Sequence, residues 1–120
     1  PIRALFKLAR KSIDMKKEIL FPFHHSLQIL SLYYGGVPGT PLEKIASLKG
    51  KGIFTEGFTE DLKEAFSHVL DLYIRQRWGI NGGSSVLSFA TMSTRQKDEL
   101  ILSLRTLREL QGMVFARFSV

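Results

Sequence analysis

Two polar side chains interrupt otherwise apolar helical stripes, and their types suit ligand binding. Arg77 falls on the stripe that contains Phe66 and Tyr73, and Gln111 falls on the apolar face of the last predicted helix. An arginine in such a position must reach solvent or pair with an anion, and its planar guanidinium suits phosphate and carboxylate. The two groups could therefore line one cleft. A structural alternative exists, because Arg75 and Arg77 near a helix C-terminus also complement the helix dipole.

The sequence contains no recognisable catalytic or metal-binding arrangement. His24 and His25 are adjacent, so on a helix they point about 100° apart and cannot easily share one metal ion. His68 is distant in sequence, and no HxxxH or HExxH spacing occurs. The chain has no cysteine, which removes thiolate nucleophiles and disulfides. We therefore expect no cofactor, no bound metal and no enzymatic activity from this chain alone.

Acidic pairs occur at Glu60-Asp61 and Asp98-Glu99. We expect both in the first turn of a helix, where the dipole favours carboxylates, so capping explains them without catalysis. The glycine-rich segments 35–39 and 79–83 match neither phosphate-binding loop pattern, and we interpret them as helix stops.

Amphipathic helices must position these side chains. Thr40 with Glu43, and Ser93 with Gln96, have the spacing of capping boxes, and Pro22 should kink a helix or mark its restart near Phe21. Residues 86–90 fit either an extended segment or one helical turn. No segment alternates with period two, so we predict no sheet. The predicted elements are a leading segment over residues 2–10 and helices over 14–34, 40–48, 55 or 59–77 (taken as the longest) and 93–118.

These elements predict an all-α protein, an antiparallel four- or five-helix bundle forming one domain over residues 1–120. Residues 1–13 are expected to be a linker or leading helix. Apolar stripes should turn inward, Leu42, Ile45 and Leu48 among them. If the bundle is detached from neighbouring domains, it should expose an apolar patch and could form a homodimer. Its candidate residues are Phe6, Phe21, Phe23 and Phe89.

The net charge is 17 − 11 = +6, but the cations are scattered. The densest cluster, residues 7–17, fits a solvated helix face or an anion-facing patch.

There is no recognition-helix motif or aromatic–basic stacking platform, so we expect no nucleic-acid partner. No apolar run approaches the roughly 20 residues of a membrane span, so no membrane is expected. The absence of cysteine fits a cytoplasmic location, and the absence of an initiator Met suggests a domain separated from its neighbours.

The order of several short motifs resembles one family. Asp14-Met15-Lys16-Lys17 is similar to its Asp-Leu-Lys-Arg opening, and Pro22 follows in the same helix. The other matching segments are Thr40-Pro41-Leu42-Glu43-Lys44-Ile45, Gly52-Ile53-Phe54-Thr55, Asp61-Leu62-Lys63-Glu64-Ala65-Phe66, Leu72-Tyr73-Ile74-Arg75, and Leu110-Gln111 with Arg117-Phe118. Over residues 14–118 the chain resembles the helical nucleotidyltransferase substrate-binding domain, which occurs beside cyclic-nucleotide-binding, CBS and nucleotidyltransferase domains in bacterial signalling proteins.

The resemblance implies a non-catalytic substrate-binding or regulatory bundle that covers the active site of a nucleotidyltransferase-like domain in the same parent protein. Asp14, Lys16, Arg75, Arg77 and Gln111 would then line a shared cleft for a nucleotide or other anionic ligand. Tyr73, Arg77 and Ile101 depart from the family pattern, which puts that binding in question. A ligand-free interaction or dimerisation bundle is the alternative.

Overall fold

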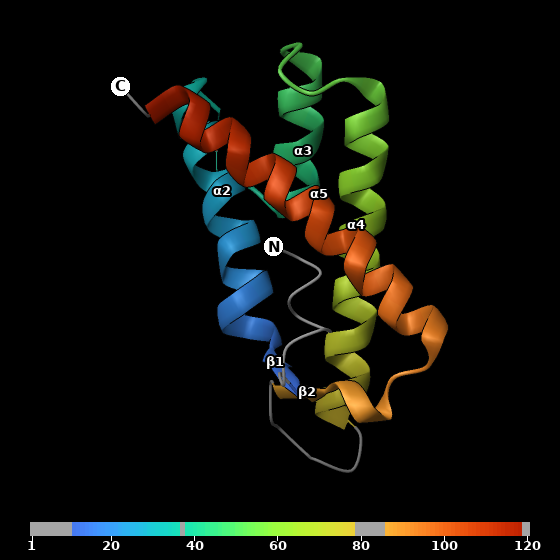
Figure 1. Cartoon of the computed structure of the whole chain (residues 1–120). Helices are drawn as coiled ribbons and strands as arrows, with labels where there is room; N and C mark the ends of the chain where they lie inside the picture. Colours follow the sequence, from blue (N-terminus) through green and yellow to red (C-terminus); the bar gives the residue numbers. More distant parts are fainter. Residues whose placement is uncertain (1–10, 37, 79–85, 119–120) are drawn as a thin grey trace.

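Four α-helices, one π-helix and a short two-stranded ribbon form the described part of the chain (Figure 1). The computed structural model describes residues 11–36, 38–78 and 86–118, without the side chains of Arg77, Trp78 and Phe118. In chain order the elements are β1 (Ser12–Asp14), the π-helix η1 (Met15–Leu20), α2 (Phe21–Tyr33), α3 (Pro41–Gly50), α4 (Glu56–Trp78), β2 (Val86–Ser88), the 3₁₀ turn η2 (Phe89–Thr91) and α5 (Thr94–Phe118).

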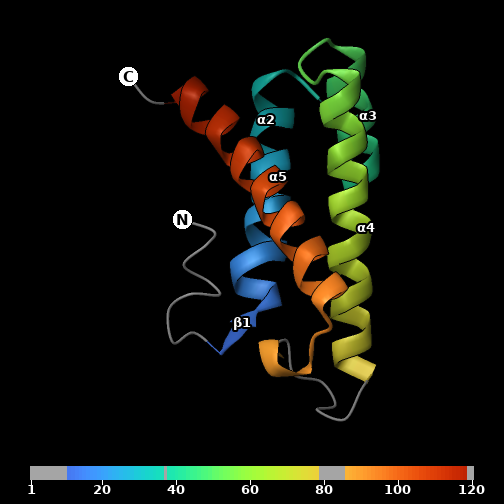
Figure 2. The same ribbon diagram turned by 45° about the vertical axis from the view of Figure 1, so that its right-hand side comes forward.

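The helices confirm the predicted all-α bundle. α3 packs against both α2 and α4, and α5 crosses obliquely to pack on α2 and α4 (Figures 1 and 2). The longest helix is α5, with 25 residues, so the prediction that the helix ending at Arg77 is longest was wrong; α4 has 23. The predicted leading segment over residues 2–10 lies outside the described residues.

One apolar core joins all four α-helices, η1 and both strands. Its most buried apolar side chains are Ile13, Met15, Ile19, Leu27, Leu30, Ile45, Leu48, Leu62, Leu100 and Leu110. Three sequence expectations fail here: Phe23 and Phe89, predicted at an association surface, are buried, while Leu42, predicted to face inward, is 50% exposed. Phe21 is exposed as expected, and Phe6 is not among the described residues.

Side-chain caps fix where the helices begin. Thr40 Oγ1 accepts from the Glu43 amide (3.2 Å), and Glu43 Oε1 accepts from the Thr40 amide (3.0 Å), which confirms the capping box that opens α3. Ser93 and Gln96 make the same reciprocal pair before α5, at 3.0 and 3.1 Å. Thr55, rather than Thr59, caps α4, because its Oγ1 accepts from the Phe58 amide (3.1 Å).

Pro22 explains the change of helix type between η1 and α2. Proline has no amide hydrogen, so it is tolerated in the first turn of an α-helix but not in its interior. The Phe21 amide donates to the Lys16 carbonyl, five residues earlier, which widens the turn immediately before Pro22. α2 then begins at Phe21, as predicted.

A three-residue ribbon corrects the prediction that the chain has no sheet. β1 and β2 pair antiparallel, with Ser12, Ile13 and Asp14 opposite Ser88, Leu87 and Val86. Ile13 and Leu87 face the core, at 2% and 5% exposure. Two such short strands, separated by more than seventy residues, carry no detectable period-two signal, and only the helices hold them side by side. The ambiguous residues 86–90 prove to be extended first and helical afterwards.

None of the described helices is both long enough and apolar enough to cross a membrane.

Candidate functional site

The longest line of helix contact in the described structure runs between α4 and α5, and we call it the seam. The two helices run in opposite directions along it, so early α4 faces late α5. Leu62, Val69 and Leu72 of α4 and the leucines of α5 at 100, 104 and 107 bury their side chains in the core. Polar side chains along the outer edge of the seam leave two hollows.

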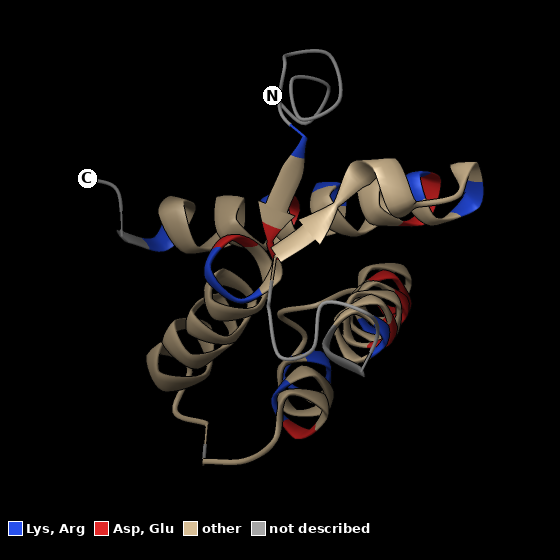
Figure 3. Ribbon diagram, turned by 90° about the horizontal axis from the view of Figure 1, so that it is seen from below, with Lys and Arg blue, Asp and Glu red and all other residues tan. Residues whose placement is uncertain are grey.

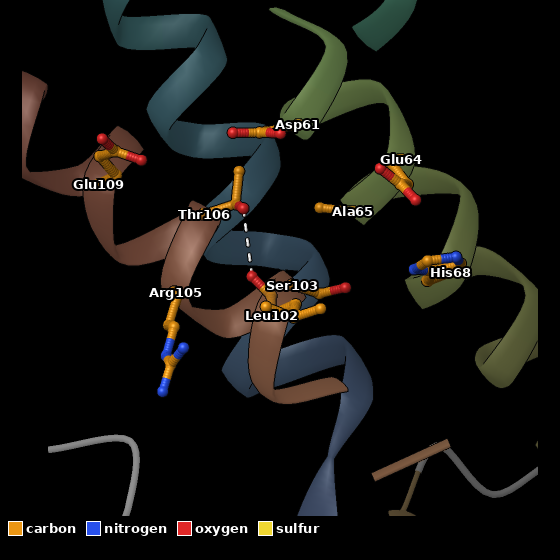
Figure 4. A pocket seen from close by; sticks show the side chains of 9 residues that line it. All are labelled: Asp61, Glu64, Ala65, His68, Leu102, Ser103, Arg105, Thr106 and Glu109. Carbon is orange, nitrogen blue, oxygen red and sulfur yellow. Dashed lines mark hydrogen bonds between the residues drawn. The ribbon is translucent and has the colours of Figure 1, made fainter. Parts of the chain in front are cut away.

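The larger hollow, which we call the groove, encloses about 270 Å³. Four of its residues come from α4 and five from α5, and they lie across from one another (Figure 4). Its volume is near the lower end of that of small-molecule sites. The lining residues are Asp61, Glu64, Ala65, His68, Leu102, Ser103, Arg105, Thr106 and Glu109.

The groove has the opposite charge to the chain as a whole. Three carboxylates, Asp61, Glu64 and Glu109, line it against one guanidinium, that of Arg105. The Arg105 side chain points away from α4 (Figure 4). Ser103 and Thr106 do not present free hydroxyl protons, because each donates to a backbone carbonyl one turn earlier in α5. The local field therefore disfavours phosphates in the groove.

A contact between His68 of α4 and Glu99 of α5 spans the seam beside the groove. His68 Nε2 lies 3.5 Å from Glu99 Oε2, and Arg95 Nε donates to the other oxygen of Glu99 at 2.9 Å. The Glu99 side chain is 27% exposed, whereas that of Arg95 is 89% exposed. This pair separates the acidic groove from the second hollow.

The second hollow lies where α4 reaches the ribbon, and we call it the ribbon pocket. It encloses about 130 Å³ between α4, β2, the turn after it and α5. Gln76 Nε2 donates to the Val86 carbonyl at 2.8 Å, which ties α4 to the ribbon. Gln96 is occupied by its capping box with Ser93. The lining residues are Leu72, Arg75, Gln76, Leu87, Thr91, Met92 and Gln96.

Arg75 is the cation of the ribbon pocket. Its Nε lies 3.0 Å from Asp71 Oδ2, and the two side chains are 67% and 57% exposed. A solvent-exposed pair of this kind contributes at most about 1 kcal/mol, so an incoming anion can replace Asp71 at small cost. The guanidinium also has donors besides Nε, which a phosphate could accept in bidentate geometry.

Two further predicted site residues lie near the ribbon. Asp14 ends β1 opposite Val86, whose carbonyl accepts from Gln76. One Asp14 oxygen accepts from the amides of Lys16 and Lys17, at 3.1 and 3.2 Å, so this carboxylate is the cap of η1. Lys16 is half-buried. Asp14, Lys16 and Arg75 are thus brought to the same end of the bundle from segments far apart in sequence.

Of the other two predicted residues, only Gln111 has a described side chain. Arg77 lies in the last turn of α4, and its side chain is outside the described part of the structure. Gln111 is half-buried in α5, fifteen residues beyond Gln96, which corresponds to about 22 Å along the helix. Gln111 is therefore remote from the ribbon pocket, and any binding role for it is separate from that of Arg75.

None of the residues that line the groove was predicted as a site residue from the sequence. The pairs Glu60-Asp61 and Asp98-Glu99 are predicted in first turns, but α4 begins at Glu56 and α5 at Thr94, so all four residues lie in second turns. A usable signal was present: Asp61, Glu64 and His68 recur at spacings of three and four beside the apolar stripe of α4. That stripe could be recognised in the sequence, but the facing edge of α5 could not.

Within the described residues, no three His, Asp or Glu side chains are placed to hold a metal ion together.

Comparison with known families gives one match. A family model described as a putative nucleotidyltransferase substrate binding domain covers residues 5–118. The match spans α2 to α5, the seam and both hollows. No curated protein and no solved structure matches the chain.

Proposed function

This chain belongs to the nucleotidyltransferase substrate-binding domain family, and on that premise we propose that it recognises substrate for a nucleotidyltransferase-like domain of the same parent protein. In this proposal the chain supplies binding and the partner domain supplies the chemistry. The seam is the surface at which substrate is held.

The proposal depends mainly on the environment of Arg75. It combines a solvent-exposed guanidinium, a weak and replaceable partner in Asp71, and a position on the rim of a pocket. A pocket of about 130 Å³ is too small for a whole nucleotide but large enough for one group of it. We therefore assign the ribbon pocket to an anionic group, such as a phosphate of a nucleotide.

The remaining predicted residues have supporting roles in the proposal. Lys16 adds positive charge at the ribbon end, and Asp14 fixes the start of η1 on which Lys16 lies. Arg77, two residues beyond Arg75 near the end of α4, would extend the cationic surface. Gln111 would contact a different part of the substrate or the partner domain, because about 22 Å of α5 separates it from the ribbon pocket.

The proposal assigns no catalytic step to this chain. Nucleotidyl transfer needs carboxylates that hold a divalent cation at the reacting phosphate. Most of the described carboxylates serve instead as caps, as partners of nearby basic side chains or as the groove lining. The proposal also takes the parent to be a cytoplasmic bacterial signal-transduction protein, which rests on the resemblance over residues 14–118.

Isothermal titration of the 120-residue chain with ATP tests the proposal. Saturable binding is expected, and Arg75→Gln should weaken it about ten- to a hundredfold, the loss associated with a hydrogen bond to a charged group. The matched control is Arg95→Gln, because Arg95 also forms an exposed ion pair with an acid four residues away. That variant should keep its affinity within about twofold.

Two results would count against the proposal. Heat that never saturates would show that the ribbon pocket does not hold ATP. Equal losses in both arginine variants would show that only general charge attraction acts, and adding salt would then abolish the binding of every variant alike.

A further inference from the structure

α2 has large apolar side chains on its outward face as well as on its inward face. Phe23, Leu27 and Leu30 point into the core. On the opposite side, Phe21, His25, Ile29 and Leu32 follow one another at spacings of four, four and three, with Tyr33 at the edge. Phe21, Ile29, Leu32 and Tyr33 are 48%, 39%, 65% and 52% exposed, and the Phe21 and His25 rings stack. We call these five residues the α2 face.

The composition of α2 indicates that a second surface covers it. Its thirteen residues include no Asp, Glu, Lys or Arg, although charged residues make up 23% of the chain. A helix that is apolar on both sides is typical of one enclosed by protein on both sides. Contiguous exposed apolar surface of this kind marks interaction sites.

The margin of the α2 face is cationic. Lys17 lies one turn before Phe21 and is exposed. The Lys44 ammonium donates to Gln28 Oε1 beside the face. At the far end, Arg117 donates to the Tyr34 hydroxyl and its guanidinium carbon lies 5.8 Å from the centre of the Tyr34 ring.

The three cations of the margin, Lys17, Lys44 and Arg117, outnumber the two nearby acids, Glu18 and Glu43. Glu18 Oε2 accepts from the Asp14 amide (2.7 Å) and Glu43 Oε1 from the Thr40 amide, so both are turned toward helix starts. The hydrogen bond from the Thr40 amide, and then that with the Thr40 hydroxyl, lower the pKa of Glu43. The occupant of the face must therefore present apolar side chains with carboxylates around them.

On the basis of the proposed function, we propose that the nucleotidyltransferase-like domain of the parent protein binds to the α2 face. The surface that it presents there is apolar and surrounded by carboxylates. A second copy of this chain fits less well, because it would bring the same cationic margins together in a molecule of net charge +6. Substrate would then bind at the seam, and α2 would hold the two domains in a fixed relation.

Cysteine labelling measures this docking directly, because the chain has no cysteine of its own. Ile29→Cys and Leu32→Cys report on the face, and Leu42→Cys, at an exposed position of α3 that lines neither hollow, is the matched control. Each variant is labelled with a maleimide in the 120-residue chain and in the intact parent, and the modified peptide is quantified by mass spectrometry. The two face thiols should react about tenfold or more slowly in the parent, since they react only while the domains are apart. The control thiol should react equally in both.

Charge reversal tests the chemistry assigned to the occupant. Lys17→Glu with Lys44→Glu should raise the labelling rate of Leu32→Cys in the parent several-fold, whereas Lys51→Glu, at an exposed position after α3, should not. Equal labelling of the face thiols in chain and parent would overturn the docking proposal. Protection that appears in the isolated chain and grows with its concentration would assign the face to a second copy instead. ATP affinity is measured without the parent, so a failure here leaves the test of the proposed function independent.

Discussion

Single side chains near helix starts have two competing explanations in this protein, capping and ligand binding. Asp14 stands in a motif whose resemblance to the family implies a binding role, yet its carboxylate accepts from the Lys16 and Lys17 amides. Thr40, Thr55 and Ser93 have the same capping role. Arg75 differs, because its only described partner is an exposed carboxylate on its own helix. Exposure with a weak partner distinguishes a candidate binding residue from a structural one.

His24 gives a pH-dependent prediction at this scale. Burial, the charge of Lys44 and then His25 lower the pKa of His24 below its ordinary value of 6.5, and its ring meets the edge of Phe66. Between the lowered value and 6.5 the unfolded chain binds more protons, so the free energy of unfolding should fall as the pH drops through this window. Because the ring is largely exposed, the loss should stay below about 1 kcal/mol.

Urea denaturation at about pH 7.5 and about pH 5.5 measures this contribution of His24. His24→Gln should reduce the difference in unfolding free energy between the two conditions. His25→Gln keeps the His24–Phe66 contact and should retain most of that difference. A difference that His24→Gln leaves unchanged would contradict the assigned cause.

Helix boundaries were predictable because their signals are local. The capping boxes at Thr40 and Ser93 and the restart at Pro22 each depend on residues within a few positions of one another. The ribbon was not predictable, because Ile13 and Leu87 pair only after the helices bring them together. Leu42 was misplaced for a similar reason: its spacing fits the stripe of α3, but only the position of the neighbouring helices decides which residues of that stripe are covered.

Gly112 provides a prediction about α5. It lies inside the helix, and a Cβ built there meets nothing within 4 Å. Gly112→Ala should therefore raise the free energy of unfolding by about 0.5–1 kcal/mol, because glycine loses more backbone entropy on folding than alanine.

Urea denaturation of Gly112→Ala and Gly52→Ala tests whether backbone conformation, rather than the space around the glycine, decides the change in the free energy of unfolding. Gly52 also has open space around it, but its φ is +76°, where a side chain is strained. Gly52→Ala should lower the free energy of unfolding. Destabilisation by Gly112→Ala would contradict the account of α5 as a regular, uncrowded helix.

The whole molecule separates its charges in a way that the sequence did not reveal. Lys and Arg are spread over several helices rather than gathered on one, as Figure 3 shows. Against this basic background the groove collects three carboxylates, the ribbon pocket has Arg75 on its rim, and the α2 face has no ionic charge along its length. The fold class and most helix ends followed from sequence periodicity. These three surfaces required the relative placement of α2, α4 and α5.

Because these surfaces differ in charge, substrate binding and domain docking are proposed for different sides of the bundle. An anionic group is favoured at the ribbon end of the seam and disfavoured in the groove, since carboxylates there repel it. The proposed docking to the partner domain uses α2, away from the polar edge of the seam. Recognition and docking can therefore be altered independently by substitution.

The central claim is that the ribbon end of the seam holds an anionic substrate group, and amide chemical shifts of the ¹⁵N-labelled chain during titration with ATP test it most directly. The account predicts saturable shifts for residues of α4 and the ribbon around the pocket, Leu72, Arg75, Gln76, Leu87, Thr91 and Gln96 among them. Amides around Glu64 and Thr106 in the groove should move little. Shifts confined to the lysines of α3, or shifts that rise without saturating, would contradict it.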